Sequence, residues 1–307
     1  MKTHATNTDS IKINPVTNCL IHLRLHYQIL LAPIFLWGYW LAHGRPSGEF
    51  WGKFWLAFVC FHLFLYGGMT AFNSYYDQDE GPVGGLKQPP PAIAALLPFS
   101  LLMQILGALL AAFVNWSFLL IYLTIFGMAT AYSHPRVRLK GRPLGGLITV
   151  GLGQGVLAAL GGWVVAQPTV ATLGLPEGLG ILAVTLVTIG FYPLTQIYQI
   201  DEDLARGDLT FAAWAGPRRT FVFAVIVQAL AALLLVMIIY TLLGLWQATV
   251  VGLFYSALLA ATIQWALHFD PSHVIANFRR VMAMNQITSL GFLSFLVLHL
   301  FVLRTYP

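Results

Sequence analysis

Residues 220–243 read TFVFAVIVQALAALLLVMIIYTLL, 24 consecutive positions without a charged side chain. A helix of this length crosses the hydrocarbon core of a bilayer, which requires about 20 largely apolar residues. The chain contains nine such runs, at 25–42, 54–72, 92–114, 116–132, 144–166, 178–198, 220–243, 246–267 and 287–303. The sequence therefore predicts an all-α integral membrane protein with nine transmembrane helices in a bundle.

The charged residues avoid these runs. Of 307 residues, 16 are Lys or Arg and 11 are Asp or Glu, and all of them lie outside the predicted spans. A bilayer enforces this segregation because an ionised side chain in hydrocarbon costs several kcal/mol. Only 9% of the residues are charged, whereas soluble domains carry about 25%. The composition therefore excludes a soluble globular protein, and the dispersed net charge of +5 does not indicate nucleic-acid binding.

The basic residues also predict an orientation. Thirteen Lys and Arg fall in the N-terminal segment and the loops of one side, and only Arg45, Lys53 and Arg304 fall on the other. Since Lys and Arg are retained on the cytoplasmic side, we expect the N-terminus inside. We expect a cytosolic tail over 1–24, a single transmembrane domain over 25–307, and a bacterial inner-membrane location with the site facing the cytoplasm.

Two acidic clusters follow the second and sixth predicted spans. They are NSYYDQDEGPVGGLKQPPP, which starts at Asn73, and YQIDEDLARGDLT, which starts at Tyr198, and they hold seven of the eleven acidic residues. Helical i, i+4 spacing places Asn73 beside Asp77, and Gln199 beside Asp203. Because both clusters begin at the cytoplasmic end of a helix, we expect them to face each other across the mouth of a lipid-accessible cavity.

Oxygen ligands from two helices suit Mg²⁺, which takes one or two carboxylates together with substrate phosphates. Basic residues nearby suit phosphate oxygens, although the same residues also serve as orientation signals. The candidate metal ligands are Asp77, Asp79, Glu80, Asp201 and Asp203, and the candidate phosphate contacts are Lys87, Arg138 and Lys140. The pattern predicts a diphosphate–magnesium site at the mouth of an apolar cavity.

The clusters resemble the motifs of the UbiA superfamily of intramembrane prenyltransferases. Asn73 and Asp77 match its first motif, N-D-x-x-D-x-x-x-D, and Asp203 with Gly207 and Thr210 matches its second motif. The run AYSHPRVRLKGRPLGG, from residue 131, is similar to the family's Y-S-x-P loop. The segment DEGPVGGLKQPP, which begins at Asp79, resembles a divergent branch of the family that includes the EboC proteins.

The chain departs from these motifs at three positions. Ser74 stands where the family has its first aspartate, Gly81 stands at the third acidic position, and Gln199 replaces the opening aspartate of the second motif. These departures keep two functions open. One is an enzyme, and the other is a non-catalytic protein that binds or handles isoprenoid or terpenoid-like lipids on the same fold.

The resemblance implies Mg²⁺-dependent transfer of a prenyl group from an allylic isoprenoid diphosphate to a lipophilic, often aromatic, acceptor. It implies catalytic roles for Asp77, Asp203 and Lys87. The expected substrate contacts are Asn73, Tyr76, Arg138, Lys140, Tyr198 and Gln199. For Tyr76 and Tyr198, membership of an interfacial aromatic belt is the competing interpretation. Glu202 and Asp208 are expected to be solvated.

Overall fold

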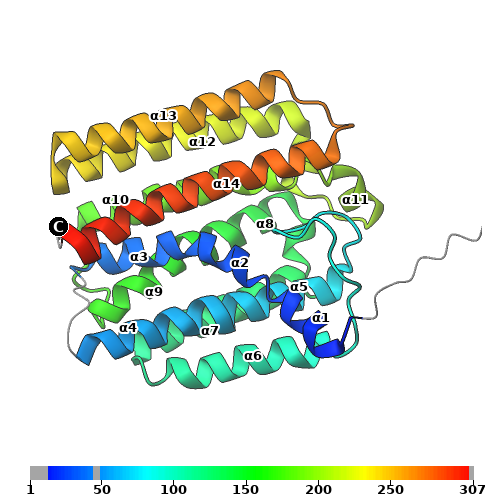
Figure 1. The fold of residues 1–307 in the computed structure, drawn as a ribbon, viewed down its shortest axis with the longest axis horizontal. Coiled ribbons are helices and arrows are strands. Elements are labelled where there is room, and N and C mark those ends of the chain that lie inside the picture. The colour runs from blue at the N-terminus through cyan, green and yellow to red at the C-terminus, as the bar shows by residue number, and fades with distance from the viewer. Residues whose placement is uncertain (1–12, 44–48, 304–307) are drawn as a thin grey trace, which may run out of the picture.

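The computed structural model describes residues 13–43 and 49–303. Within these ranges every regular element is a helix, apart from one isolated bridge between Val83 and Leu86. Figure 1 shows the long helices running side by side in one bundle, with the described chain beginning and ending at opposite ends of it. The all-helical membrane class predicted from the apolar runs is confirmed.

The helices follow the chain in a regular succession. Short 3-10 or π segments join α2 to α3, α4 to α5 and α8 to α9, so several membrane-crossing units contain two labelled helices. The α-helices are α1 (Pro15–His22), α2 (Leu25–Gln28), α3 (Ala32–Leu41), α4 (Glu49–Val59), α5 (Gly67–Asp77), α6 (Leu96–Ala111), α7 (Trp116–Ser133), α8 (Pro143–Val150), α9 (Leu157–Ala166), α10 (Leu175–Phe191), α11 (Ile200–Ala205), α12 (Phe211–Leu243), α13 (Leu245–Leu267) and α14 (Val274–Val297).

Eight helical units in the described ranges are long and apolar enough to cross a membrane, rather than the nine predicted. The predicted span over 92–114 forms α6, which has 16 residues. Three consecutive prolines, ending at Pro91, precede it and hold the chain out of helical geometry. With 16 residues, α6 is apolar but below the length counted as a full crossing, so the ninth span stays a prediction.

Other helices are longer than their apolar runs. α12 begins at Phe211, with a kink at Gly216, where φ is 74°, and α14 begins at Val274. The pairs Arg218–Arg219 and Arg279–Arg280 therefore lie on helices, in exposed positions near their ends, and not in loops. Long basic side chains at such ends reach the interface while their stems cover apolar surface.

The predicted tail over 1–24 and the predicted orientation both involve residues that the structure describes only in part. Helix α1 lies inside the segment predicted as a tail, and its Asn18 side chain donates a hydrogen bond to the main-chain oxygen of Pro91. The N-terminal orientation stays a prediction. Four of the charges that support it, Lys2, Lys12, Arg45 and Arg304, lie outside the described residues.

The backbones of α3 and α9 make a close contact in the bundle. A Cβ added at Gly38 would overlap the main-chain oxygen of Ala159, and one added at Gly162 would overlap that of Phe35. Glycine at both positions lets the two backbones touch, as small residues do in membrane helix pairs. The contact holds α3 and α9 against each other beside a buried hydrophobic cluster that includes Trp37.

We expect Gly162→Ala to lower the thermal unfolding temperature of the purified protein in detergent. The added methyl must separate two backbones, and overpacking of this kind costs about 1–3 kcal/mol. Gly127→Ala is the matched control, because no atom lies within 4 Å of a Cβ built at this position. Equal unfolding temperatures for the two variants would contradict the role given to the α3–α9 contact.

Candidate active site

The two acidic clusters meet at one end of the bundle, and Arg206 joins them. Its Nη1 donates to Asp79 Oδ1 at 2.5 Å and to the main-chain oxygen of Asp77 at 3.2 Å. Its Nη2 lies 3.4 Å from Asp203 Oδ1. One guanidinium therefore bridges segments that are more than 120 residues apart in the sequence.

Asp77 is the last residue of α5, and Gln78 then turns the chain in the left-handed conformation. A carboxylate at a helix C-terminus faces the negative end of the helix dipole, so it needs cations nearby. The loop between α7 and α8 supplies two of them. Lys140 Nζ forms an ion pair with Asp77 Oδ2, and Arg138 Nη2 lies 3.7 Å from Asp77 Oδ1.

Asp203 lies in the first turn of α11, on the inward side of that helix. Thr210, which caps the N-terminus of α12, donates from its Oγ1 to Asp203 Oδ2 at 3.2 Å. Burial raises the pKa of Asp203 to about 6, against the opposing effects of Arg206 and Lys140. The Asp203 carboxylate therefore takes up a proton at a higher pH than an ordinary aspartate does.

Asp208 was expected to be solvated, and this prediction is wrong. It is only 2% exposed and accepts two hydrogen bonds from Arg138, at 2.5 Å from Nε and 2.7 Å from Nη2. This bidentate contact raises the pKa of Arg138. The reason is the turn at Gly207, where φ is 80°, which returns the chain inward after α11.

A polar vestibule with a volume of about 170 Å³ lies among these charged groups, and all of them except Arg138 line it. Two carboxylate atoms in it, Asp77 Oδ1 and Asp79 Oδ2, are buried without a hydrogen-bond partner among the described residues. Buried polar atoms are normally paired, so these two indicate a ligand. The vestibule is lined by Arg24, Tyr27, Asn73, Asp77, Asp79, Val83, Gly84, Tyr132, Lys140, Tyr192, Thr195, Gln196, Tyr198, Gln199, Asp203, Arg206, Asp208, Thr210 and Met282.

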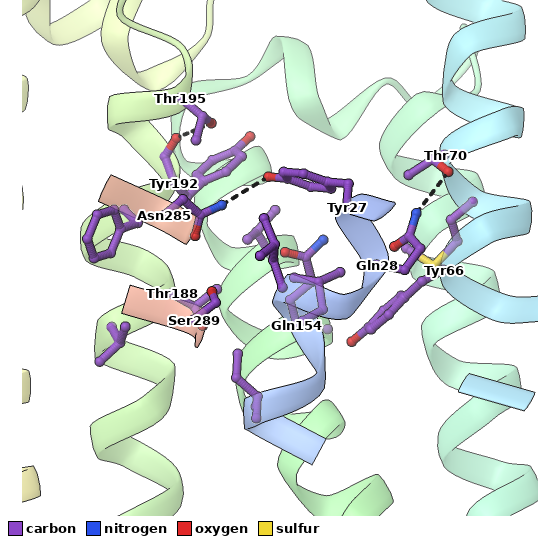
Figure 2. A pocket seen from close by; sticks show the side chains of 18 of the residues that line it. Tyr27, Gln28, Tyr66, Thr70, Gln154, Thr188, Tyr192, Thr195, Asn285 and Ser289 are labelled. Atoms are coloured by element: carbon purple, nitrogen blue, oxygen red, sulfur yellow. Dashed lines mark hydrogen bonds between the residues drawn. The ribbon is translucent and has the colours of Figure 1, made fainter. Parts of the chain in front are cut away.

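An inner chamber of about 280 Å³ adjoins the vestibule, with walls from several membrane-crossing helices (Figure 2). Several of its hydroxyl groups bond back to their own helices. Thr188 donates to the main-chain oxygen of Val184 at 3.0 Å, and Thr288 donates to that of Met284 at 2.8 Å. Since these hydroxyls are satisfied locally, much of the wall presents carbon to a ligand.

Three tyrosines belong to both cavities and form a rim between them. The hydroxyls of Tyr132 and Tyr192 lie 3.0 Å apart. From the other side, Asn285 Nδ2 donates to the Tyr27 hydroxyl at 3.3 Å, as Figure 2 shows. Asn73 and Thr195 are also shared by the two linings. A ligand with a polar head and an apolar tail fits both compartments across this rim.

Seven of the predicted site residues line the vestibule: Asn73, Asp77, Asp79, Lys140, Tyr198, Gln199 and Asp203. Arg138 lies behind them, against Asp77 and Asp208. Tyr76 packs on His134, with ring centroids 5.3 Å apart, and lines neither of the two cavities.

The structure does not bring Glu80, Lys87 and Asp201 to either cavity, and all three are exposed. Glu80 lies beyond the left-handed turn at Gln78, which directs the chain away from α5. Asp201 precedes Asp203 by two residues on α11, and positions two apart on a helix do not share a face. Lys87 follows the tight turn closed by Val83 and Leu86.

Sequence reasoning missed Arg24 and Arg206 as site residues, because both also fit an orientation signal. In the described part of the chain no three His, Cys, Asp or Glu side chains form a ready-made metal site. The carboxylates are instead paired with Lys140 and Arg206. A divalent cation has to compete with these basic groups for Asp77 and Asp79.

The chain belongs to the UbiA prenyltransferase family, whose sequence model matches residues 31–287. A digeranylgeranylglyceryl phosphate synthase from Methanothrix thermoacetophila is 30% identical over 176 residues, which are 56% of this chain and 62% of that protein. The match therefore spans less than two thirds of this relative. The finer resemblance to EboC-like proteins stays a prediction.

Solved structures share the fold. A UbiA homolog from Archaeoglobus fulgidus bound to GPP and Mg²⁺ has a TM-score of 0.63 and 18% identity, with 90% of this chain and 99% of that chain covered. The apo structure of a UbiA homolog from Aeropyrum pernix K1 has a TM-score of 0.64 and 21% identity, with 88% and 98% covered. At these identities the likeness establishes the fold.

We expect Arg206→Gln to lower stability by on the order of 2 kcal/mol, because it leaves Asp79 and Asp203 buried without their shared cation. Thermal unfolding of the variant and of Arg136→Gln, an exposed basic residue of the same end of the bundle, provides the comparison. If both variants unfold at the wild-type temperature, Arg206 does not hold the two segments together.

Proposed function

We propose that the protein is a Mg²⁺-dependent prenyltransferase that moves a prenyl group from an allylic isoprenoid diphosphate to a lipophilic acceptor within the membrane. The observation that carries this proposal is the pair of adjoining cavities. A polar vestibule with four aspartates, three of them buried, opens across a tyrosine rim into a largely carbon-walled chamber. Membership of the prenyltransferase family and the GPP and Mg²⁺ in a structural relative support it.

The residues of the vestibule fit Mg²⁺. Asp77, Asp79 and Asp203 would hold it, since two of these carboxylates carry buried oxygens without a hydrogen bond among the described residues and hard oxygen ligands suit this ion. When bound, Mg²⁺ neutralises the diphosphate and makes it a better leaving group. Glu80, Lys87 and Asp201 have no part in this proposal because they lie outside the vestibule.

The remaining residues hold and shield the substrate. Lys140 lines the vestibule beside Asp77 and would stabilise negative charge that develops on the departing diphosphate, whereas Arg138 supports Asp77 from behind. Asn73 accepts a hydrogen bond from the Ser133 hydroxyl at 2.8 Å, which fixes its amide at the rim. The tyrosine rings exclude water from the carbon atom that loses the diphosphate, and their faces stabilise positive charge there.

The inner chamber would receive the acceptor as well as the prenyl tail. Tyr66 Oη and Gln28 Oε1 line it and have no hydrogen-bond partner among the described residues. Polar substituents on a ring, such as hydroxyl groups, would satisfy both atoms. We therefore propose an aromatic acceptor that carries such groups. We also propose a bacterial inner-membrane location with the vestibule facing the cytoplasm.

A second function is favoured by one observation. Asp77 and Asp79 are already neutralised by Lys140 and Arg206, and no three-carboxylate metal cluster is preformed in the described ranges. A protein that binds isoprenoid lipids without reacting them would show the same pairing. Turnover with Mg²⁺ separates the two functions.

We expect the purified protein to release diphosphate from radiolabelled allylic diphosphates only when Mg²⁺ is present. Asp77→Asn and Asp203→Asn should each reduce this release at least 100-fold, since loss of a metal ligand removes several kcal/mol of transition-state stabilisation. Asp270→Asn is the matched control, because Asp270 is exposed and lies in the loop between α13 and α14. Binding of the diphosphates by wild type without any turnover would favour the lipid-handling function.

The raised pKa of Asp203 predicts that Mg²⁺ binding depends on pH. With a pKa of about 6, Asp203 is ionised above this pH and binds the cation, whereas below it a proton neutralises the ligand. We expect the Mg²⁺ concentration for half-maximal turnover to rise as the pH falls from 7 to 5. A concentration that stays constant over this range would show that Asp203 does not bind the ion.

A further inference from the structure

We propose that Arg24 is a built-in cation that anchors the diphosphate group in the vestibule without a metal ion. The inference rests on the proposed function for the identity of the ligand, and it concerns a residue that the motifs do not include. The diphosphate head of the substrate would then bind even when Mg²⁺ is absent.

Arg24 occupies an unusual position in the chain. It lies between α1 and α2 with φ at 49° and ψ at 44°, the left-handed conformation that residues with a side chain rarely adopt. The bend directs its side chain to the vestibule, and only 4% of the residue is exposed. Strained backbone of this kind persists where the surrounding structure fixes a functional group.

Arg24 also differs from the other cations of the site in its partners. Lys140 pairs with Asp77, Arg206 with Asp79, and Arg138 with Asp208. Arg24 instead bonds to a neutral side chain, because its Nη2 donates to the Ser74 hydroxyl at 2.7 Å.

No carboxylate in the described ranges lies within ion-pair distance of Arg24, and its Nε has no hydrogen-bond partner among those residues. A buried charge without an ion pair is costly, and Asp79 and Asp77 act on Arg24 only from a greater distance, so the site favours an anionic ligand. The guanidinium presents several donors in one plane, which suits the oxygens of a phosphate.

Two neighbours keep this charge available. Ser74 offers a hydroxyl where a carboxylate would neutralise the guanidinium. Gly84 lies against Arg24 so closely that an added Cβ would overlap Nη1. The loop at Gly84 therefore covers the guanidinium and limits its access to water, which strengthens its attraction for an anion.

The test measures binding to the full-length protein in detergent after removal of divalent cations with EDTA. The probes are inorganic diphosphate and geranyl diphosphate, with phosphatidic acid as the arm that represents a lipid headgroup. We expect wild type to bind both diphosphates without Mg²⁺, and Arg24→Gln to weaken this binding at least tenfold. Arg136→Gln, which changes an exposed arginine, should bind as wild type does.

A second pair of variants leaves Arg24 in place. Ser74→Asp puts a carboxylate beside the guanidinium and should weaken metal-free binding by a similar factor, whereas Ser74→Ala should retain it. This pair keeps the proposal testable if Arg24→Gln does not fold. Absence of metal-free binding in wild type, equal binding by wild type and Arg24→Gln, equal binding by the two Ser74 variants, or binding of phosphatidic acid alone would overturn the proposal.

The outcome is distinguishable from that of the proposed function. Metal-free binding that depends on Arg24, in a protein that never turns over with Mg²⁺, would support the anchor and reject the enzyme. Turnover with Mg²⁺ that is accompanied by no Arg24-dependent binding in EDTA would reject the anchor and leave the enzyme in place.

Discussion

The architecture of the site depends on the position of Arg206 between two acidic segments. Asp77 and Asp79 at the end of α5 and Asp203 on α11 would repel one another if they met without a cation. The guanidinium contacts both segments and also the last main-chain oxygen of α5. Lys140 completes the neutralisation from a third loop. The vestibule therefore has a defined shape because basic groups from separate parts of the chain balance its carboxylates.

Much of this arrangement is predictable from the sequence, since bilayer physics is simple. Exclusion of charge from apolar runs predicts the helices, and placement of two acidic clusters after helix ends predicts that Asp77 and Asp203 share a cavity. The details depend on single backbone conformations. The left-handed Gln78 and the turn at Gly207 decide which neighbouring carboxylates face inward. No local pattern specifies that Asp208 is buried while Asp201 is exposed.

Basic site residues are harder to predict from the sequence, because the same residue type also serves as an orientation signal. An arginine near a span end fits an orientation signal whether it is solvated or buried. Arg24 becomes a site residue only when the bend between α1 and α2 is known. The lengths of the helices are also difficult to predict from the sequence. α12 and α14 begin well before their apolar runs, whereas α6 begins only after a run of prolines. None of these helix starts follows from hydropathy alone.

The tyrosine rim has a consequence for the fate of reaction products. In the proposed prenyl transfer the diphosphate leaves as a multiply charged ion, the acceptor loses a proton, and the prenylated acceptor is more apolar than the acceptor was. On this proposal the ion would leave through the polar vestibule, whereas the prenylated acceptor would stay in the largely carbon-walled chamber. The two products thus partition into different phases as soon as they separate. Their re-encounter at the site would therefore be rare, whereas the overall equilibrium of the reaction does not depend on the fold.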